Sequence, residues 1–188
     1  MMVRPSTLEK SKLYRYLEDG ATGLMIPHVS SPEKAKSLVN SIKFPPLGDR
    51  GIDGAGMDSN FMLKGGYEYT GPANDETFLV VQIETLEAVE NVDQIAAVEG
   101  VDSLFIGTGD LGLRINKLGP DLDLEQSIIK IAEAANKHGK AWGRPVSGDD
   151  DIKKILSQGA TLLPYGGDFT MLKDELERHS KVLTECLK

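Results

Sequence analysis

Two acidic residues each stand at the end of a short apolar stretch of the sequence. Glu84 lies in the stretch Val80–Thr85, and Asp110 lies in the stretch Ser103–Leu111. One helix-length segment separates the two stretches, a pattern that predicts two successive parallel strands. In a barrel of alternating strands and helices, active sites are assembled at the carboxyl ends of the strands. Because two carboxylates with room for water suit a hard divalent cation, Glu84 and Asp110 are candidate metal ligands.

The alternative for these two residues is structural. Acidic side chains commonly cap helices or occupy the first helical turn. Glu84 would then cap a helix that begins near Thr85, and Asp110 would cap the next helix. Spacing alone favours this capping role over a metal site.

The elements that must position the two carboxylates follow a regular order. Six apolar stretches are typical of strands, at 1–5, 23–27, 80–84, 103–107, 140–144 and 161–164. Segments with helical periodicity or capping signals lie between them, for example at 6–20, 31–42, 124–138, 149–158 and 168–187. Ser6 is the expected cap of the first of these helices, and Ser31 before Pro32 marks the start of the second. Strict alternation of this kind favours a parallel sheet and a (β/α) barrel of the TIM type. The sequence therefore predicts an α/β fold with about six of the eight barrel strands, lacking the N-terminal part of the barrel.

One region departs from this alternation. Residues 45–76 are rich in glycine and proline, and within them only 61–63 suggest a short helix. An insertion of this length between repeating units is long for a compact domain, so we expect it to serve function or oligomer formation. The whole chain, 1–188, is most simply one domain that carries this insertion.

Composition limits the classes of partner. The chain has 188 residues, 40% of them hydrophobic, with a formal net charge of −8. Nucleic acids and anionic membranes both require a basic patch, so neither is expected to be a partner. Cys186 is the single cysteine, and no apolar run approaches the ~18 residues of a membrane span. These features predict a cytoplasmic protein.

Several blocks of the sequence, in this order, resemble the HpcH/HpaI aldolase/citrate lyase family, whose members include metal-dependent, pyruvate-using aldolases. The blocks are Val3-Arg4-Pro5, Gly23-Leu24-Met25-Ile26-Pro27, Phe44-Pro45-Pro46-Leu47-Gly48-Asp49-Arg50-Gly51, Val81-Gln82-Ile83-Glu84, Val98-Glu99-Gly100-Val101-Asp102 and Phe105-Ile106-Gly107 with Asp110-Leu111. The resemblance covers nearly the whole chain. It implies a barrel fold, a small 2-keto acid such as pyruvate or oxaloacetate with an aldehyde as partners, and a homo-oligomer ranging from dimer to hexamer.

The resemblance also implies roles for individual residues. Glu84 and Asp110 match the family's ligands for Mg²⁺, Mn²⁺ or Co²⁺. Arg4 matches an arginine that contacts the ketoacid and steadies its enolate, and Gln82 matches a polar residue below the metal. The backbone amides of Gly109 and Asp110 match donors to the ketoacid carboxylate. Such a set is chemically coherent, because a cation and a guanidinium together stabilise an enolate.

Other positions depart from the family pattern. The family's catalytic histidine lies on a loop that precedes the first matched block, so no residue here matches it, and its acidic partner matches Glu18. The usual Gly-Pro-Ala-Asp-Leu-Ser becomes Gly-Thr-Gly-Asp-Leu-Gly at 107–112. His28, which follows a strand where the family has an apolar residue, is either a substitute base or a loop histidine. Arg144, at the end of another strand, either meets the substrate or forms a salt bridge at the rim.

Three functions agree with these residues. The first is a class II aldolase, a carbon–carbon lyase that acts through a metal-bound pyruvate enolate on substrates of the 2-keto-3-deoxy acid type. The second is a catalytically impaired homologue that acts as an oligomer subunit. The third is a lyase of the citrate-lyase or CoA-ester type. The missing N-terminal part of the barrel favours the second function, whereas Arg4, Glu84 and Asp110 favour the first.

Overall fold

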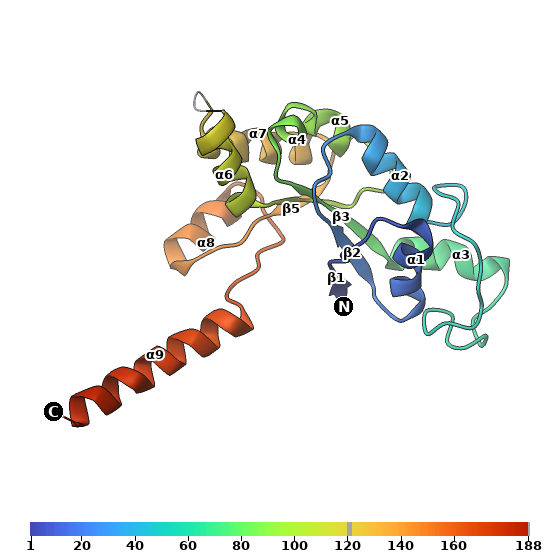
Figure 1. Ribbon diagram of the computed structural model, residues 1–188. Helices are drawn as coiled ribbons and strands as arrows, with labels where there is room; N and C mark the ends of the chain where they lie inside the picture. Colours follow the sequence, from blue (N-terminus) through green and yellow to red (C-terminus); the bar gives the residue numbers. More distant parts are fainter. Residues whose placement is uncertain (120–121, 188) are drawn as a thin grey trace.

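The computed structural model describes residues 1–119 and 122–187, and it contains a parallel sheet covered by helices (Figure 1). Within these ranges the sheet has five strands in the order β1-β2-β3-β4-β5, namely β1 (Met2–Val3), β2 (Gly23–Ile26), β3 (Phe78–Ile83), β4 (Ser103–Ile106) and β5 (Ala141–Gly143). Its helices are α1 (Lys10–Glu18), α2 (Pro32–Ile42), the 3-10 helix η1 (Tyr67–Tyr69), α3 (Thr70–Glu76), α4 (Leu86–Glu90), α5 (Val92–Ala96), α6 (Thr108–Leu118), α7 (Leu124–Lys137), α8 (Gly148–Ser157) and α9 (Asp168–Cys186). Strands adjacent in sequence are adjacent in the sheet, as in a segment of a (β/α) barrel.

The two faces of β3 have different surroundings. Residues 79, 81 and 83 belong to the main hydrophobic core, which also contains residues from the helices. Val80 points the other way and packs with Met25 and Phe105 in a small separate cluster. Since side chains alternate along a strand, Gln82 and Glu84 continue the face of Val80. The fold therefore puts these two polar residues on the face of the sheet opposite the main core.

The predicted strand at 161–164 lies beside β5 but is not one of the five strands of the sheet. This segment makes only the isolated parallel bridges Gly143 to Leu162 and Val146 to Tyr165. A Cβ atom at Gly143 would lie 1.7 Å from the backbone oxygen of Leu162, so only glycine lets the two backbones come this close. Pro164 also lacks the N–H group that would continue a ladder.

Two predicted helix starts have different outcomes. Ser31 caps α2 as expected, because its side chain accepts a hydrogen bond from the N–H of Lys34 at 3.3 Å and Pro32 follows it. In contrast, α1 begins at Lys10, and Glu9 at its N-cap makes no side-chain cap bond. The expectation that Ser6 caps this helix was therefore wrong.

The glycine-rich insertion is built from turns, η1 and α3. A helix at 61–63 was predicted and is absent, because Asn60, Phe61 and Met62 all have positive φ angles, of 51°, 53° and 73°. Such angles cannot continue a right-handed helix. The side chains of Phe61 and Met62 are 65% and 73% exposed, so this part of the insertion presents apolar surface to solvent.

The insertion contains a polar cluster of its own. Arg50 Nη2 lies 2.6 Å from Asp58 Oδ2, and the Tyr69 hydroxyl donates to the same oxygen at 2.5 Å. The guanidinium of Arg50 stacks 4.4 Å from the centre of the Phe44 ring, a cation–π contact. Burial and the bond to Asp58 raise the pKa of Tyr69. These contacts join the beginning, middle and end of the insertion.

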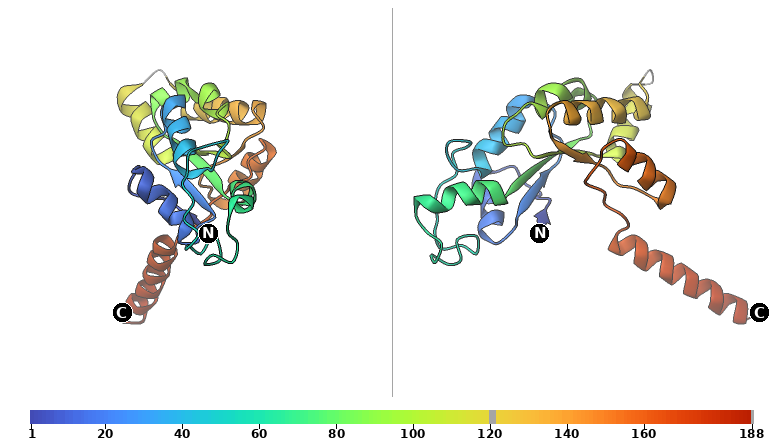
Figure 2. Two further views of the ribbon diagram at one scale, coloured as in Figure 1. Left: turned by 90° about the vertical axis from the view of Figure 1, so that its right-hand side faces the viewer. Right: turned by 180° about the vertical axis from the view of Figure 1, so that it is seen from behind.

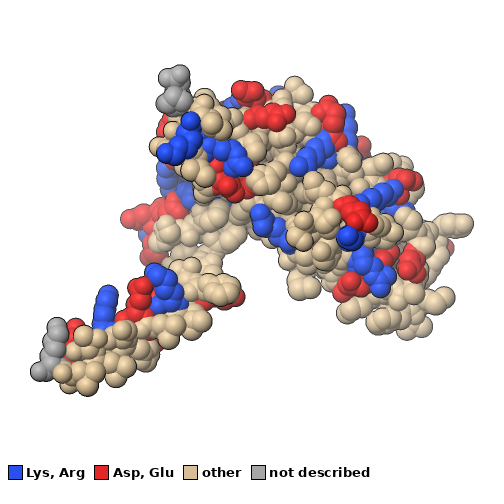
Figure 3. Space-filling model, in the orientation of Figure 1, with Lys and Arg blue, Asp and Glu red and all other residues tan. Residues whose placement is uncertain are grey.

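The last helix, α9, projects away from the body of the molecule (Figures 1 and 2). None of its 19 residues is buried, including Phe169, Leu172, Leu176 and Leu183. Charged residues gather along one side of this helix, and a tan surface covers the other side (Figure 3). No helix formed by residues 1–119 and 122–187 combines the length and the apolar content needed to span a bilayer.

Candidate active site

The register between β3 and β4 fixes the position of Glu84. Ile83 pairs with Ile106, and the N–H of Gly107 donates to the carbonyl of Ile83 at 3.1 Å. Glu84 follows directly and is only 1% exposed. A Cβ atom on Gly107 would lie 2.4 Å from Glu84 Oε2, so the carboxylate packs against bare backbone that only glycine provides.

A line of hydrogen bonds connects Glu84 to the first strand. Gln82 Nε2 donates to Glu84 Oε2 at 2.8 Å, and Arg4 Nε donates to Gln82 Oε1 at 3.1 Å. The amide of Gln82 therefore orients both the carboxylate and the guanidinium. Three residues that the sequence singled out separately are brought together on the ends of β1 and β3.

His28 contacts the other oxygen of the same carboxylate. Its backbone N–H donates to Glu84 Oε1 at 2.9 Å, and its ring Nδ1 lies 3.2 Å from that oxygen. The φ angle of His28 is 55°, in the left-handed region that a residue with a side chain rarely adopts. Strained residues of this kind persist where several contacts hold them, and they cluster at functional sites. Here Lys34 Nζ also holds the carbonyl of His28, at 2.7 Å.

Asp110 lies at the same edge of the sheet, in the first turn of α6. Its side chain is half exposed, and Oδ1 lies 3.2 Å from Arg114 Nη1. Within the described ranges, no three His, Cys, Asp or Glu residues cluster as a metal site would. A cation held by Glu84 and Asp110 would need further oxygens from water or substrate, as Mg²⁺ commonly has.

The capping alternative for Glu84 was wrong. Thr85 caps α4, because its side-chain oxygen accepts from the N–H of Ala88 at 3.0 Å. The alternative for Asp110 was wrong in detail, because α6 begins at Thr108 and Asp110 is its third residue. The first N–H groups of a helix lack acceptors within the helix, and Gly109 and Asp110 occupy this position in α6.

Arg144 forms the salt bridge that was its structural alternative. Its two terminal nitrogens meet Asp151 at 3.1 and 2.5 Å, and Nη1 also donates to the carbonyl of Pro145. The Arg144 guanidinium and the N–H of Ser147 hold the pKa of Asp151 below its usual range. The guanidinium is thus engaged within the chain, at the start of α8.

Glu18 lies at the opposite edge of the sheet. It is the last residue of α1, which leads into the beginning of β2, whereas Glu84 follows the end of β3. Glu18 is 2% exposed, and its Oε1 has no hydrogen-bond partner among the described residues. Burial raises the pKa of this carboxyl, although the nearby Arg50 and Arg15 act in the other direction.

The roles of two residues at the site escaped sequence reasoning. Lys34 supports the backbone of His28, and Gly107 makes room for the Glu84 carboxylate. The signal for Lys34 was its position three residues after the helix cap Ser31, close to the end of β2. The direction of its side chain could not be read from that position.

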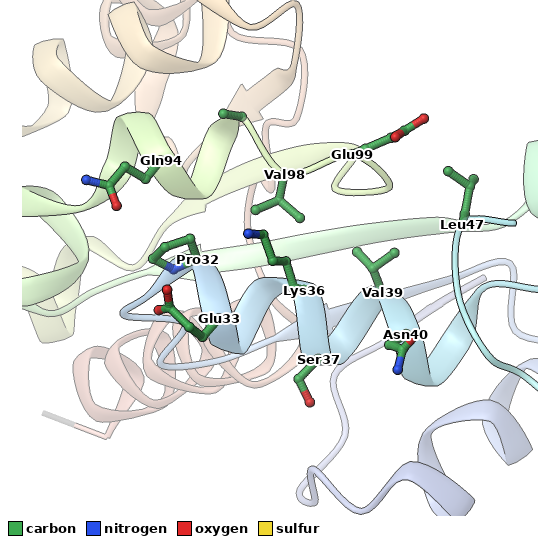
Figure 4. Close-up of a pocket in the computed structure, with 11 residues that line it drawn as sticks. Pro32, Glu33, Lys36, Ser37, Val39, Asn40, Leu47, Gln94, Val98 and Glu99 are labelled. Carbon is green, nitrogen blue, oxygen red and sulfur yellow. The ribbon is translucent and has the colours of Figure 1, made fainter. Parts of the chain in front are cut away.

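A larger hollow lies away from these residues. Its volume is about 770 Å³, and α2 and the segment around Val98 border it on the helical side of the sheet (Figure 4). Its labelled side chains include Glu33, Lys36 and Glu99, none of which contacts the carboxylate at the end of β3. The polar groups that converge on Glu84 therefore identify the candidate site better than the volume of a hollow does.

Known proteins resemble the chain along most of its length. A family model described as HpcH/HpaI aldolase/citrate lyase matches residues 1–174. A hydroxypyruvate/pyruvate aldolase of Deinococcus radiodurans is 36% identical over 173 residues, which are 91% of this chain and 62% of the relative. A 5-keto-4-deoxy-D-glucarate aldolase of Escherichia coli is 33% identical over 179 residues, or 94% of this chain and 69% of the relative.

A solved structure agrees with these relatives. The crystal structure of an HpcH/HpaI aldolase from Desulfitobacterium hafniense superposes with a TM-score of 0.87 and 30% identity, covering 98% of this chain and 72% of the other. The chain therefore spans about two thirds of the length of the proteins it resembles.

We predict that Glu18→Gln raises the free energy of unfolding near pH 7. The folded state binds the Glu18 proton more tightly than the unfolded state, so the charged carboxylate costs stability at neutral pH. The gain should shrink as pH falls through the folded-state pKa and vanish below the ordinary value of 4.5. Urea unfolding from pH 4 to 7 measures it, with the exposed Glu90→Gln as control. A gain that is the same at every pH would contradict the prediction.

Proposed function

Because the chain belongs to the HpcH/HpaI aldolase/citrate lyase family, we propose that it is a metal-dependent class II aldolase that makes or breaks a carbon–carbon bond next to a 2-keto acid. The observation that carries this proposal is the buried Glu84 carboxylate, to which Arg4 is connected through Gln82. The proposed substrate is of the 2-keto-3-deoxy acid type, and pyruvate or oxaloacetate is the small ketoacid.

Glu84 and Asp110 are the proposed ligands of a divalent cation, Mg²⁺, Mn²⁺ or Co²⁺. The surroundings of Glu84 fit this role, since a buried carboxylate needs compensating charge and its partners in the chain are an amide, a backbone N–H and the His28 ring. Oε2 accepts the bond from Gln82 and has a second lone pair for a cation. When bound, a cation supplies Lewis acidity that favours the enolate of the ketoacid.

The chain's own residues perform the remaining tasks. Arg4 uses Nε to bond Gln82, which leaves its two terminal nitrogens to contact the oxygen where enolate charge develops. The free amides of Gly109 and Asp110 orient the ketoacid carboxylate. The backbone at Gly107 keeps Glu84 shielded from water.

His28 is the proposed acid–base residue. The ring lies at the carboxyl end of β2 and is half exposed, so a substrate hydroxyl can reach it. Its backbone is fixed on both sides, by Glu84 and by Lys34. This fixed backbone supports a role in removing a proton from the hydroxyl during aldol cleavage.

We predict that Mg²⁺ or Mn²⁺ raises the thermal midpoint and that Glu84→Gln with Asp110→Asn removes the effect. At a metal concentration of 100 times Kd, binding to the native state adds about 2.7 kcal/mol, or roughly 5–10 °C for a domain of this size. Calorimetry with and without metal measures the shift, and Glu87→Gln, an exposed acid in the same region, is the control. Equal shifts in wild type and double variant would refute these ligands.

We predict that the chain decarboxylates oxaloacetate better than it cleaves aldols. Decarboxylation needs the cation and Arg4. Aldol cleavage needs both of these and also a base that removes the proton of the substrate hydroxyl. Arg4→Ala should lower decarboxylation by about 10²–10³-fold, while the exposed Arg15→Ala leaves it unchanged. His28→Gln should spare decarboxylation and lower cleavage by about 10²–10⁴-fold.

The outcomes of these assays separate the candidate functions. Full cleavage in His28→Gln would show that another group is the base. Metal binding without either reaction would favour the impaired homologue that acts as an oligomer subunit.

We propose, finally, that the chain forms a homo-oligomer through its insertion. Phe61, Met62 and Leu63 are 65%, 73% and 82% exposed, an apolar patch of the kind that a second copy covers. Light scattering at micromolar concentration should give at least twice the 20.4 kDa of one chain. Phe61→Ser with Leu63→Ser should shift the mass towards one chain, whereas Leu118→Ser, on α6, should not. A monomeric wild type would contradict this proposal.

A further inference from the structure

A hollow of about 300 Å³ opens next to the candidate active site. It is bordered by residues 4–8, which connect β1 to α1, and by Pro27, His28 and Lys34. His28 separates this hollow from Glu84. Its backbone N–H and its ring contact the Glu84 carboxylate, and the same residue lines the hollow. A molecule that reacts at Glu84 therefore has adjoining space for the part remote from the ketoacid.

The lining of this hollow is cationic, although the chain as a whole has a net charge of −8. Its cations are Arg4 and Lys34, the His28 ring lies beside them, and no carboxylate lines the hollow. Neither Arg4 nor Lys34 forms an ion pair with any residue in the ranges 1–119 and 122–187. The hydroxyl groups of Ser6 and Thr7 add polar surface. Unpaired cations in a concave site suit an anion.

Lys34 is held at this hollow by two contacts. Its backbone N–H is bound by the capping Ser31, and its ammonium donates to the carbonyl of His28 at 2.7 Å. An ammonium has three N–H donors, so two are left after this bond. The same bond helps to hold the left-handed backbone of His28. An anion bound to Lys34 would consequently lie next to His28, the residue that contacts Glu84.

We propose that this hollow is a second anion subsite, in which Lys34 binds a carboxylate or phosphate at the end of the substrate remote from the ketoacid. The aldehyde released or accepted is then an anionic one. This inference rests on the proposed aldolase function, because only a reaction at Glu84 makes the hollow part of a substrate site. The proposed function does not specify the charge of the aldehyde, and the subsite adds that this charge is negative.

Histidine NMR tests the subsite directly, since the chain has only three histidines. Butyrate, ethyl phosphate and the neutral isostere butyramide are titrated into the full chain with EDTA present, and the ring C–H signals are followed. His28→Gln assigns the signal of His28. The expected result is a saturable shift of that signal with the anions, little shift with butyramide, and no shift of His138 or His179. The anion with the lower dissociation constant identifies the chemistry that the subsite prefers.

Variants separate the charge of Lys34 from its structural role. Lys34→Met should weaken anion binding by about 10- to 100-fold, the effect of losing one charge-assisted hydrogen bond. Lys34→Arg should retain binding. Lys36→Met should also retain it, because Lys36 lies on the same helix but lines the hollow of about 770 Å³ instead. Equal shifts with butyramide, no shift with any probe, or undiminished binding in Lys34→Met would each overturn the proposal.

The titration is independent of the aldolase assays because metal is removed. Anion binding at Lys34 with no oxaloacetate turnover would leave the subsite standing and remove the proposed reaction. Turnover with no anion binding would do the reverse.

Discussion

A carboxylate that is withdrawn from water must be surrounded by groups that compensate its charge, and this requirement at Glu84 connects most of the features described above. The side chain is 1% exposed, so its oxygens take donors from the amide of Gln82 and from the backbone of His28. Gly107 is needed because any larger residue would meet Oε2. Residues at the ends of β2, β3 and β4 thus surround one buried charge. Arg4, at the end of β1, is connected to it through its hydrogen bond to Gln82.

Much of this arrangement could be predicted from local patterns. Alternating apolar stretches and helical segments gave the parallel order of β1 to β5, and Ser31 before Pro32 marked the start of α2. The strand ends placed Glu84 and Asp110 at one edge, because parallel strands share an edge whatever the rest of the fold does. Family resemblance, rather than spacing, pointed to Arg4 and Gln82.

The remainder depends on contacts that no local pattern encodes. The left-handed backbone of His28 is held by Glu84, which is 56 positions away, and by a lysine whose side chain could have pointed to solvent. The segment after β5 has the apolar pattern of a strand, yet it forms only isolated bridges, with the backbone of Leu162 lying against Gly143. Positive φ angles at 60–62 likewise replaced the expected short helix with turns.

The projecting helix α9 has a thermodynamic consequence of its own. With no buried side chain, it is held by its own backbone bonds and by exposed pairs such as Arg178 with Glu175. Most of the stability of a helix in a protein comes from packing of its apolar face, which α9 lacks. Its amide protons should therefore exchange with deuterated solvent far faster than those of β3, and its helicity in the single chain should melt gradually, apart from the cooperative transition of the sheet.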